Sequence, residues 1–288
     1  MIHIEHFTFN SFQTRCCVVW DDTLECAIVD PGCSAPSEIA ALTSFIDGHG
    51  LKPVCIMLTH GHFDHVLGVA ELASRYGIPA GGSDGPDSGT SGPDGPVGHD
   101  GLGSGTSGPD GSVAALPVYM HPDDKFTLEN NGYFCKWFGA PLPAAFETVD
   151  VREAAGSDGG CLAGGSCSMD EGCSMDGRDY VPEGISTVKV GGLRFQVIET
   201  PGHTVGGVCY YEPDEKVLFS GDTLFAGAIG RTDHPGGDYD QLIRNILEKL
   251  MVLDGSVTVI PGHGPCSDIA REGMTNPFLL PFNEPFEE

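Results

Sequence analysis

The sequence has few basic residues and no long hydrophobic run. Among its 288 residues, Lys and Arg total 14 against 41 Asp and Glu, which gives a formal net charge of −27. A chain this acidic repels phosphate backbones, so we expect no nucleic-acid partner. No apolar stretch approaches the roughly 20 residues that a membrane-spanning helix needs, so we expect no membrane partner.

A secretory signal is also missing from the first residues. Residues 1–6 have neither a basic region nor an apolar core of the signal-peptide type, which predicts a cytosolic location. The 11 cysteines are odd in number and scattered, as expected of thiols in a reducing compartment. Cys26, Cys55 and Cys209 lie in apolar, strand-like runs, and we predict that they are small core residues.

Two stretches are poor in large hydrophobic side chains. The octapeptide Ser-Gly-Thr-Ser-Gly-Pro-Asp-Gly occurs at 88–95 and again at 104–111. Such a composition buries too little apolar area to offset the entropy lost on ordering. We therefore predict a single domain over residues 1–288, with low-complexity insertions at about 81–115 and 152–183. Cysteines spaced by six in the second insertion lack the close pairing of zinc ligands, so we interpret them as exposed thiols: Cys161, Cys167 and Cys173.

Strand and helix patterns alternate through the rest of the chain. Short apolar or alternating runs predict strands at 2–9, 15–20, 25–30, 54–58, 117–121, 187–190, 193–199, 205–212, 216–220 and 257–260. Amphipathic spacing predicts helices at 36–48, 66–76, after 121, at 238–251 and near 267–274. This mixture places the protein in the α/β (α+β) class.

The segment Thr59-His-Gly-His-Phe-Asp-His65 carries the strongest functional signal. It follows a buried strand and precedes a helix, so His60, His62 and Asp64 alternate in extended chain and share one side. Helix onset at Asp64 is expected to turn His65 away from His60 and His62. Two imidazoles facing one point, with a carboxylate and an imidazole facing a neighbouring point, suit two adjacent cations.

Three further turns place metal-binding side chains at strand ends. His203 and His263 each follow Pro-Gly, and Asp222 follows Ser-Gly. His121 also ends a strand, but we interpret it as a plain strand-end residue, and His99 as a loop histidine. Asp30, at the end of the third strand, either caps the following turn or orients a metal-bound histidine.

The order of these motifs resembles the metallo-β-lactamase fold superfamily, and within it the glyoxalase II (hydroxyacylglutathione hydrolase) branch. The run from Gly221 to Asp233, followed by His-Pro-Gly-Gly-Asp238, and the later Thr275-Asn-Pro-Phe278 are similar to short, single-domain bacterial members of that branch. The resemblance implies a four-layer αββα sandwich with the metals at one edge of its two sheets.

By the same resemblance, His60, His62 and His203 hold a first divalent metal, and Asp64, His65 and His263 hold a second. Asp222 bridges the two, and Asp64 and Asp222 are the catalytic carboxylates. The metal is expected to be zinc, although iron and manganese accept the same ligands. Arg231 either contacts the glutathione part of the substrate or pairs with Asp233 or Asp238.

The implied activity is hydrolysis of acyl thioesters of the S-lactoylglutathione type. A hydroxide shared by the two metals is expected to attack the thioester carbonyl, and the thiolate leaves readily near neutral pH. Two alternatives stay open. One is a mononuclear-iron persulfide dioxygenase of the same superfamily, which also carries a Gly-Arg-Thr-Asp run; the other is a non-catalytic metal-binding interaction module.

Overall fold

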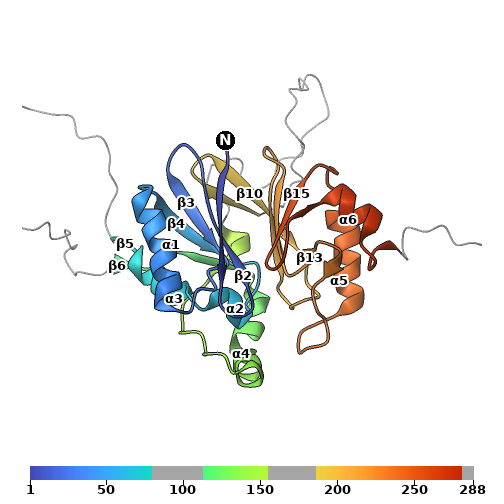
Figure 1. Ribbon diagram of the computed structural model, residues 1–288, viewed down its shortest axis with the longest axis horizontal. Helices are drawn as coiled ribbons and strands as arrows, with labels where there is room; N and C mark the ends of the chain where they lie inside the picture. Colours follow the sequence, from blue (N-terminus) through green and yellow to red (C-terminus); the bar gives the residue numbers. More distant parts are fainter. Residues whose placement is uncertain (80–112, 155–185, 281–288) are drawn as a thin grey trace, which may run out of the picture.

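The protein folds into four layers, two sheets packed face to face and helices on both outer sides (Figure 1). The computed structural model describes residues 1–79, 113–154 and 186–280. In Figure 1, α1 and α3 cover one sheet on the left, and α5 and α6 cover the other on the right. The predicted α/β class and αββα sandwich are confirmed.

The N-terminal half of the chain supplies the first sheet. In spatial order its strands are β1 (His3–Phe9), β2 (Thr14–Trp20), β3 (Glu25–Val29), β4 (Lys52–Met57), β7 (Val118–Met120) and β8 (Val149–Asp150). The first three are antiparallel, whereas β3, β4, β7 and β8 run parallel. The carboxyl ends of β4 and β7 therefore meet at one edge.

The second sheet comes from the C-terminal half. Its order is β16 (Ser267–Asp268), β15 (Thr258–Pro261), β12 (Val217–Gly221), β11 (Val208–Glu212), β10 (Leu193–Glu199) and β9 (Thr187–Val190). β12 and β15 are parallel, and β11 is antiparallel to both β10 and β12. The strands β10, β12 and β15 consequently share one direction and end at one edge.

The helices lie outside the sheets or at their edge. On the outer faces are α1 (Pro36–Gly48), α3 (Val69–Arg75), α5 (Tyr239–Asn245), continued by a π-helical turn (Ile246–Leu250), and α6 (Ile269–Thr275). At the bottom of Figure 1 lie α2 (Phe63–Val66) and α4 (Lys125–Phe138). Two 3₁₀ turns (Pro122–Asp124 and Val151–Glu153) and two two-stranded ladders complete the described fold: β13 (Leu224–Phe225) with β14 (Ala228–Ile229), and β5 (Ile78–Pro79) with β6 (Val113–Ala114).

Alternation along the central strands explains why both faces of each sheet are apolar. In β3, Cys26 and Ile28 pack toward α1 and α3, whereas Ala27 and Val29 pack between the sheets. A third cluster joins the second sheet to α5 and α6. Cys26, Cys55 and Cys209 are fully or almost fully buried, which confirms their prediction as core residues.

Several predicted ends of helices and strands differ from those in the structure. The predicted helix 66–76 is two helices, because Gly68 donates its N–H to Pro31 and a side chain at Gly68 would collide with Cys33. The predicted strand 205–212 begins only at Val208, and the helix 238–251 changes to π geometry at Ile246. The short strands β8, β13, β14 and β16 were not predicted, since two residues carry no periodic signal.

The ends of the predicted insertions also differ from expectation. β6 lies within the predicted range 81–115, where it pairs with β5, so residues 79 and 113 are brought side by side. The 3₁₀ turn Val151–Glu153 overlaps the predicted start of the second insertion. His99, Cys161, Cys167 and Cys173 lie outside the described residues. In the part of the chain that the structure describes, no helix combines the length and the apolar character needed to cross a membrane.

Candidate metal centre

All seven predicted metal-binding side chains lie at the edge where β4, β10, β12 and β15 end. His60 and His62 follow β4, and α2 carries Asp64 and His65. His203, Asp222 and His263 follow β10, β12 and β15, the three strands of the second sheet that share one direction. Residues separated by up to 203 positions are thus brought together by strand direction and by the packing of the two sheets.

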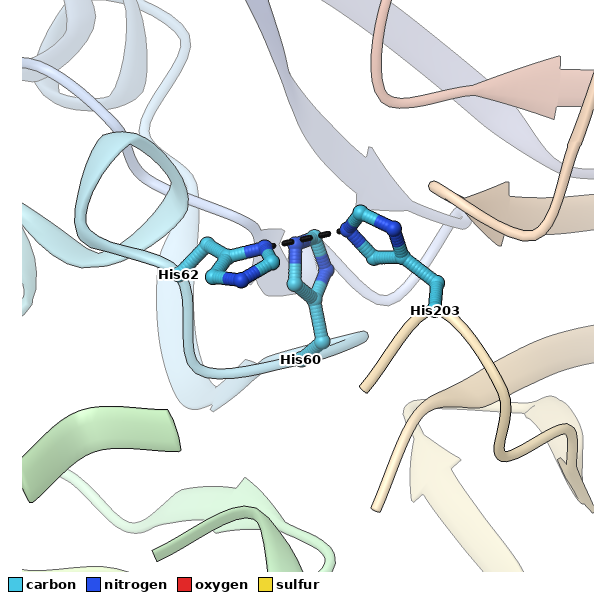
Figure 2. Close-up of side chains that lie close together, drawn as sticks. All are labelled: His60, His62 and His203. Atoms are coloured by element: carbon cyan, nitrogen blue, oxygen red, sulfur yellow. Dashed lines mark hydrogen bonds between the residues drawn. The ribbon is translucent and has the colours of Figure 1, made fainter. Parts of the chain in front are cut away.

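His60, His62 and His203 form a first group of nitrogen atoms (Figure 2). One ligand atom from each lies within 4.8 Å of the others, and all three side chains are buried. Figure 2 shows the imidazoles of His62 and His203 pointing toward one another across His60. The distance between His62 Nδ1 and His203 Nε2 is 3.0 Å.

Asp64, His65 and His263 form a second group, within the same limit of 4.8 Å. His65 Nε2 lies 3.2 Å from His263 Nε2. The carboxylate of Asp222 lies between the groups, because its Oδ2 is 3.6 Å from His203 Nε2 and 3.4 Å from His263 Nε2. This carboxylate is therefore placed to face both groups at once.

The second nitrogen of each of two imidazoles lies beside a side chain that follows a strand of the first sheet. His65 Nδ1 lies 3.1 Å from Asp30 Oδ2, and His60 Nδ1 lies 3.1 Å from the Thr59 hydroxyl. Asp30 also accepts hydrogen bonds from the Thr59 backbone N–H at 2.8 Å and from its hydroxyl at 2.6 Å. Of the two interpretations of Asp30, this contact with His65 Nδ1 supports the one in which it orients a histidine of the site.

Backbone carbonyls and a hydroxyl hold other members. His203 Nδ1 lies 2.7 Å from the carbonyl oxygen of Arg231, and His263 Nδ1 lies 3.0 Å from that of Phe12. Thr14 donates its hydroxyl proton to Asp64 at 2.7 Å. With the far nitrogens engaged, the near nitrogens and oxygens of these side chains point to the centre of the site.

Asp124 ties the two halves of the site together and was missed by sequence reasoning. Its fully buried carboxylate accepts hydrogen bonds from the backbone N–H of Gly61, between His60 and His62, and from that of Gly206 at 3.1 Å. Asn131 bonds the carbonyl of Gly61 at 2.8 Å. The available signal was position, because Asp124 follows a strand parallel to the one that precedes His60.

Burial and neighbouring charges shift the pKa of the five histidines of the site in two opposite directions. Burial lowers the pKa of His60, His62 and His203, so these imidazoles are neutral, the form that binds metals. Burial also disfavours the charge on His65 and His263, yet the neighbouring carboxylates Asp64 and Asp222 raise the pKa of His65 well above its usual value and that of His263 to about 9.

The carboxylates respond in the opposite direction. Burial acts to raise the pKa of Asp64 and Asp222, but the positive charge of His65 and hydrogen bonding to His263 lower that of Asp64 to about 2 and that of Asp222 well below its usual range. The two buried negative charges thus require positive charge beside them, which protons on imidazole or metal cations supply.

The donor set fits divalent cations. The buried atom His60 Nε2, whose ring has its other nitrogen beside the Thr59 hydroxyl, has no hydrogen-bond partner among the described residues, although buried nitrogens are ordinarily paired. Five imidazoles and two carboxylates, with the two groups sharing one carboxylate, match the nitrogen and oxygen ligands of zinc, iron or manganese.

Two histidine predictions have different outcomes. His65 joins Asp64 and His263 and not the group of His60, His62 and His203, as expected. It is nevertheless closer to His60 than expected, because the two ring centroids are 4.2 Å apart and both residues form a further set with Asp222. His121 is buried, its Nδ1 accepts a hydrogen bond from the Asp123 backbone at 3.3 Å, and it belongs to neither group, as predicted for a strand-end residue.

Gly262, before His263, leaves room for the site. A Cβ atom at this position would lie 2.5 Å from Asp222 Oδ1 and 2.6 Å from His65 Cε1. We expect Gly262→Ala to displace Asp222 and to reduce bound metal and turnover by at least about 100-fold, since metal ligands tolerate errors of only about 0.2 Å. Metal content and kcat/KM measure the effect.

Gly48→Ala is the matched control. A Cβ at Gly48, the last residue of α1, meets no heavy atom within 4 Å. It should leave metal content and rate at the native level. A Gly262→Ala protein with native metal content and native rate would contradict the packing argument.

A cavity of about 340 Å³ opens beside the two groups. Arg231 lies at its rim, with its side chain 68% exposed and paired to Asp233 at 2.9 Å. The alternative in which Arg231 pairs with Asp233 is therefore confirmed, and the same side chain also lines the cavity. His234 packs against the rings of His62 and His203, with centroids 5.0 and 5.1 Å away.

The fold and the site define a class of protein. The model of the metallo-beta-lactamase superfamily matches residues 10–95 and 112–263, and the chain belongs to this superfamily of metal-dependent hydrolases. Its predicted resemblance to the superfamily is confirmed.

Individual relatives are similar over nearly the whole chain. The chain is 30% identical to the hydroxyacylglutathione hydrolase GloC of Haemophilus influenzae over 278 residues, 96% of this chain and 98% of that one. It is 29% identical to YqgX, a probable metallo-hydrolase of Bacillus subtilis, with 90% and 89% of the two chains covered.

Two solved structures are similar over nearly their full length. The B3 metallo-beta-lactamase BLEG-1 is 28% identical, with a TM-score of 0.66 and 96% of this chain and 99% of that one covered. TTHA1623 in a di-iron-bound form is 28% identical, with a TM-score of 0.62 and coverage of 96% and 100%.

Proposed function

We propose that the protein hydrolyses acyl thioesters, of the S-2-hydroxyacylglutathione type, with two divalent cations. His60, His62 and His203 would hold one cation, Asp64, His65 and His263 the other, and Asp222 both. The observation that carries the proposal is the Asp222 carboxylate, which lies 3.6 Å from His203 and 3.4 Å from His263. The similarity to GloC supports the thioester as substrate.

Thioester hydrolysis follows from the assignment of these side chains to two cations. Bound cations lower the pKa of a water molecule to near 7 and polarise an acyl carbonyl. The buried neutral imidazoles His60, His62 and His203 and the ionised Asp222 are the forms needed to hold cations near neutral pH. In the net reaction water adds to the acyl carbon, the C–S bond breaks, and a carboxylic acid and a thiol are released.

Metal analysis combined with a substrate panel tests the proposal. We expect about two divalent ions per chain and release of free thiol from S-lactoylglutathione, followed with a thiol reagent. Absence of thiol release by the metal-loaded protein would contradict a thioesterase. Similarity to BLEG-1 makes a β-lactam the second candidate substrate, so a penicillin and a cephalosporin belong in the panel.

The same panel separates the remaining alternatives. One iron per chain and oxygen uptake with glutathione persulfide would identify the dioxygenase, although complete donor sets in both groups support two cations. Bound metal without turnover on any substrate would identify a non-catalytic module. We further propose a cytosolic location. We also propose that the protein has no nucleic-acid partner, for which the net charge of −27 is the support.

Arg231 tests the glutathione part of the proposal. Arg231→Gln removes the cation at the cavity rim but keeps the backbone carbonyl that bonds His203. We expect KM for S-lactoylglutathione to rise about 2- to 5-fold with kcat unchanged, because an exposed charge contributes uniform binding of this size. A thioester of the uncharged thiol N-acetylcysteamine should show no change in KM, and an equal rise for both thiols would contradict this role.

A further inference from the structure

The walls of the cavity beside the metal centre are apolar. Apart from the proposed metal ligands, eight residues line it, and all but Arg231 and His234 are hydrophobic: Phe12, Phe63, Phe134, Phe138, Phe225 and Ile229. A small polar acyl group such as lactoyl would leave most of this surface in contact with water. The lining therefore favours a larger apolar group.

One wall is a cluster of three phenylalanine rings. Phe12 meets Phe63 and Phe138 edge to face, with centroids 5.1 and 5.3 Å apart. Phe63 is buried, but Phe138, the last residue of α4, remains 45% exposed although it lies against the other two rings. Phe12 and Phe63 are fixed near the second group, since the Phe12 carbonyl bonds His263 and Phe63 precedes Asp64.

The separate two-stranded hairpin of β13 and β14 adds apolar surface from the C-terminal half of the chain. It carries Phe225 and Ile229, and the Phe225 ring lies 6.3 Å from that of His263. A buried network holds this hairpin, because Glu272 accepts the N–H of Gly227 at 2.8 Å and Asn276 donates to the carbonyl of Ala228 at 3.1 Å. Aromatic and aliphatic surface from both halves of the chain thus flanks the second group.

We infer that the site prefers thioesters whose acyl group carries an aromatic ring or a bulky apolar chain next to the carbonyl. The inference rests on the proposed thioester hydrolysis and specifies its acyl group. A ring beside the reacting carbonyl would be removed from water against Phe138 and the rings behind it, where edge-to-face contacts add to the gain from burial. A methyl group at the same place would leave the Phe138 ring exposed.

Two thioesters that differ only at this point test the preference. S-mandeloylglutathione and S-lactoylglutathione share the thiol and the 2-hydroxyl group and differ by a phenyl ring in place of a methyl group. We expect kcat/KM to be at least about tenfold higher for the mandeloyl compound. Phe138→Ala should lower the mandeloyl-to-lactoyl ratio about tenfold, and Phe138→Leu, which keeps part of the apolar surface, should lower it less.

Trp137→Ala is the matched control. Trp137 precedes Phe138 on α4, is 74% exposed and does not line the cavity, so its removal should leave the ratio at the native value. A ratio below one for the native protein, or an equal change in ratio for the variants at 137 and 138, would overturn the inference.

A binding measurement separates failure of the inference from failure of the proposed function. Calorimetry with mandelate and lactate on the metal-loaded protein measures, without turnover, how tightly the phenylalanine cluster binds each acyl group. Mandelate should bind at least tenfold more tightly, and Phe138→Ala should remove the difference. Absence of hydrolysis of both thioesters would contradict the proposed function, whereas equal binding of mandelate and lactate would overturn the acyl preference.

Discussion

Asp222→Asn will leave the protein folded but will reduce its metal content and lower kcat/KM by about 10³-fold, a loss of about 4 kcal/mol of transition-state stabilisation. The carboxylate lies 3.5 Å from His65, 3.6 Å from His203 and 3.4 Å from His263, so it belongs to the surroundings of both groups. An amide has nearly the same shape but supplies one weak acceptor and no negative charge.

The electrostatic reason for this effect is the balance of charge in a buried site. Asp222 and Asp64 are the two carboxylates of the candidate centre, and the pKa of Asp222 lies well below its usual range because of His65 and His263. Loss of one negative charge weakens the attraction for divalent cations at both positions. Metal content by mass spectrometry and rates of thiol release measure the change.

Asp233→Asn is the control for Asp222→Asn. It makes the same chemical change nearby, but the side chain is 71% exposed and pairs only with Arg231 among the described residues. Because exposed ion pairs contribute little, metal content and kcat should stay at the native values. Native metal content and rate in Asp222→Asn would rule out its role as a shared ligand.

Asp124→Asn is expected to lower both stability and metal affinity. The Asp124 carboxylate accepts hydrogen bonds from the N–H groups of Gly61 and Gly206 and from the Thr127 hydroxyl at 2.9 Å, and it is fully buried. In the variant, an amide NH₂ group replaces one carboxylate oxygen. This group cannot accept a hydrogen bond, so at least one of these buried donors is left unpaired. The cost is about 3 kcal/mol in the free energy of unfolding, which corresponds to a fall in Tm of roughly 6–12 °C.

The effect on metal affinity follows from the same hydrogen bonds. Gly61 lies between His60 and His62, and Gly206 lies three residues after His203, so Asp124 positions all three members of the first group. We expect metal affinity to fall about 10- to 100-fold, as for other residues that orient ligands. Thermal unfolding and competition with a chelator measure the two effects.

The neighbouring residue supplies the control. Asp123→Asn changes an identical side chain that is 70% exposed, and its Tm and metal affinity should match those of the native protein. Equal Tm and equal metal affinity of the variants at 123 and 124 would show that the Asp124 carboxylate does not hold the segments at Gly61 and Gly206.

Much of the fold could be predicted because hydrophobic periodicity records burial. The strands from β1 to β4 and from β9 to β12 appear as alternating or apolar runs, and α1 as an amphipathic one. Two-residue strands such as β13 and β14 have no period to detect. The break at Gly68 depends on the approach of Pro31 and Cys33, which are distant in sequence.

The ligand set could be predicted for a different reason. Five of its members follow a strand directly, and Asp64 and His65 lie in the short helix after β4. Pro-Gly before His203 and His263 marks two of these turns in the sequence itself. Asp124 was not predicted, because in its motif, His121-Pro-Asp-Asp, the histidine is the more obvious candidate ligand. The partners of the Asp124 carboxylate are mainly backbone N–H groups. Because nearly every residue has a backbone N–H group, the sequence does not show which of these groups will bond a given carboxylate.

By itself the sequence determined which side chains are available for chemistry, namely five histidines and two aspartates at or just after strand ends, and a strongly negative net charge. Only the tertiary structure decided how they meet. The shared direction of β10, β12 and β15 brings His203, Asp222 and His263 to the edge that holds His60, and Asp30, Thr59 and Asp124 then orient them. The physical reason is that strand patterns are local, whereas strand direction and buried hydrogen bonds join residues far apart in the chain.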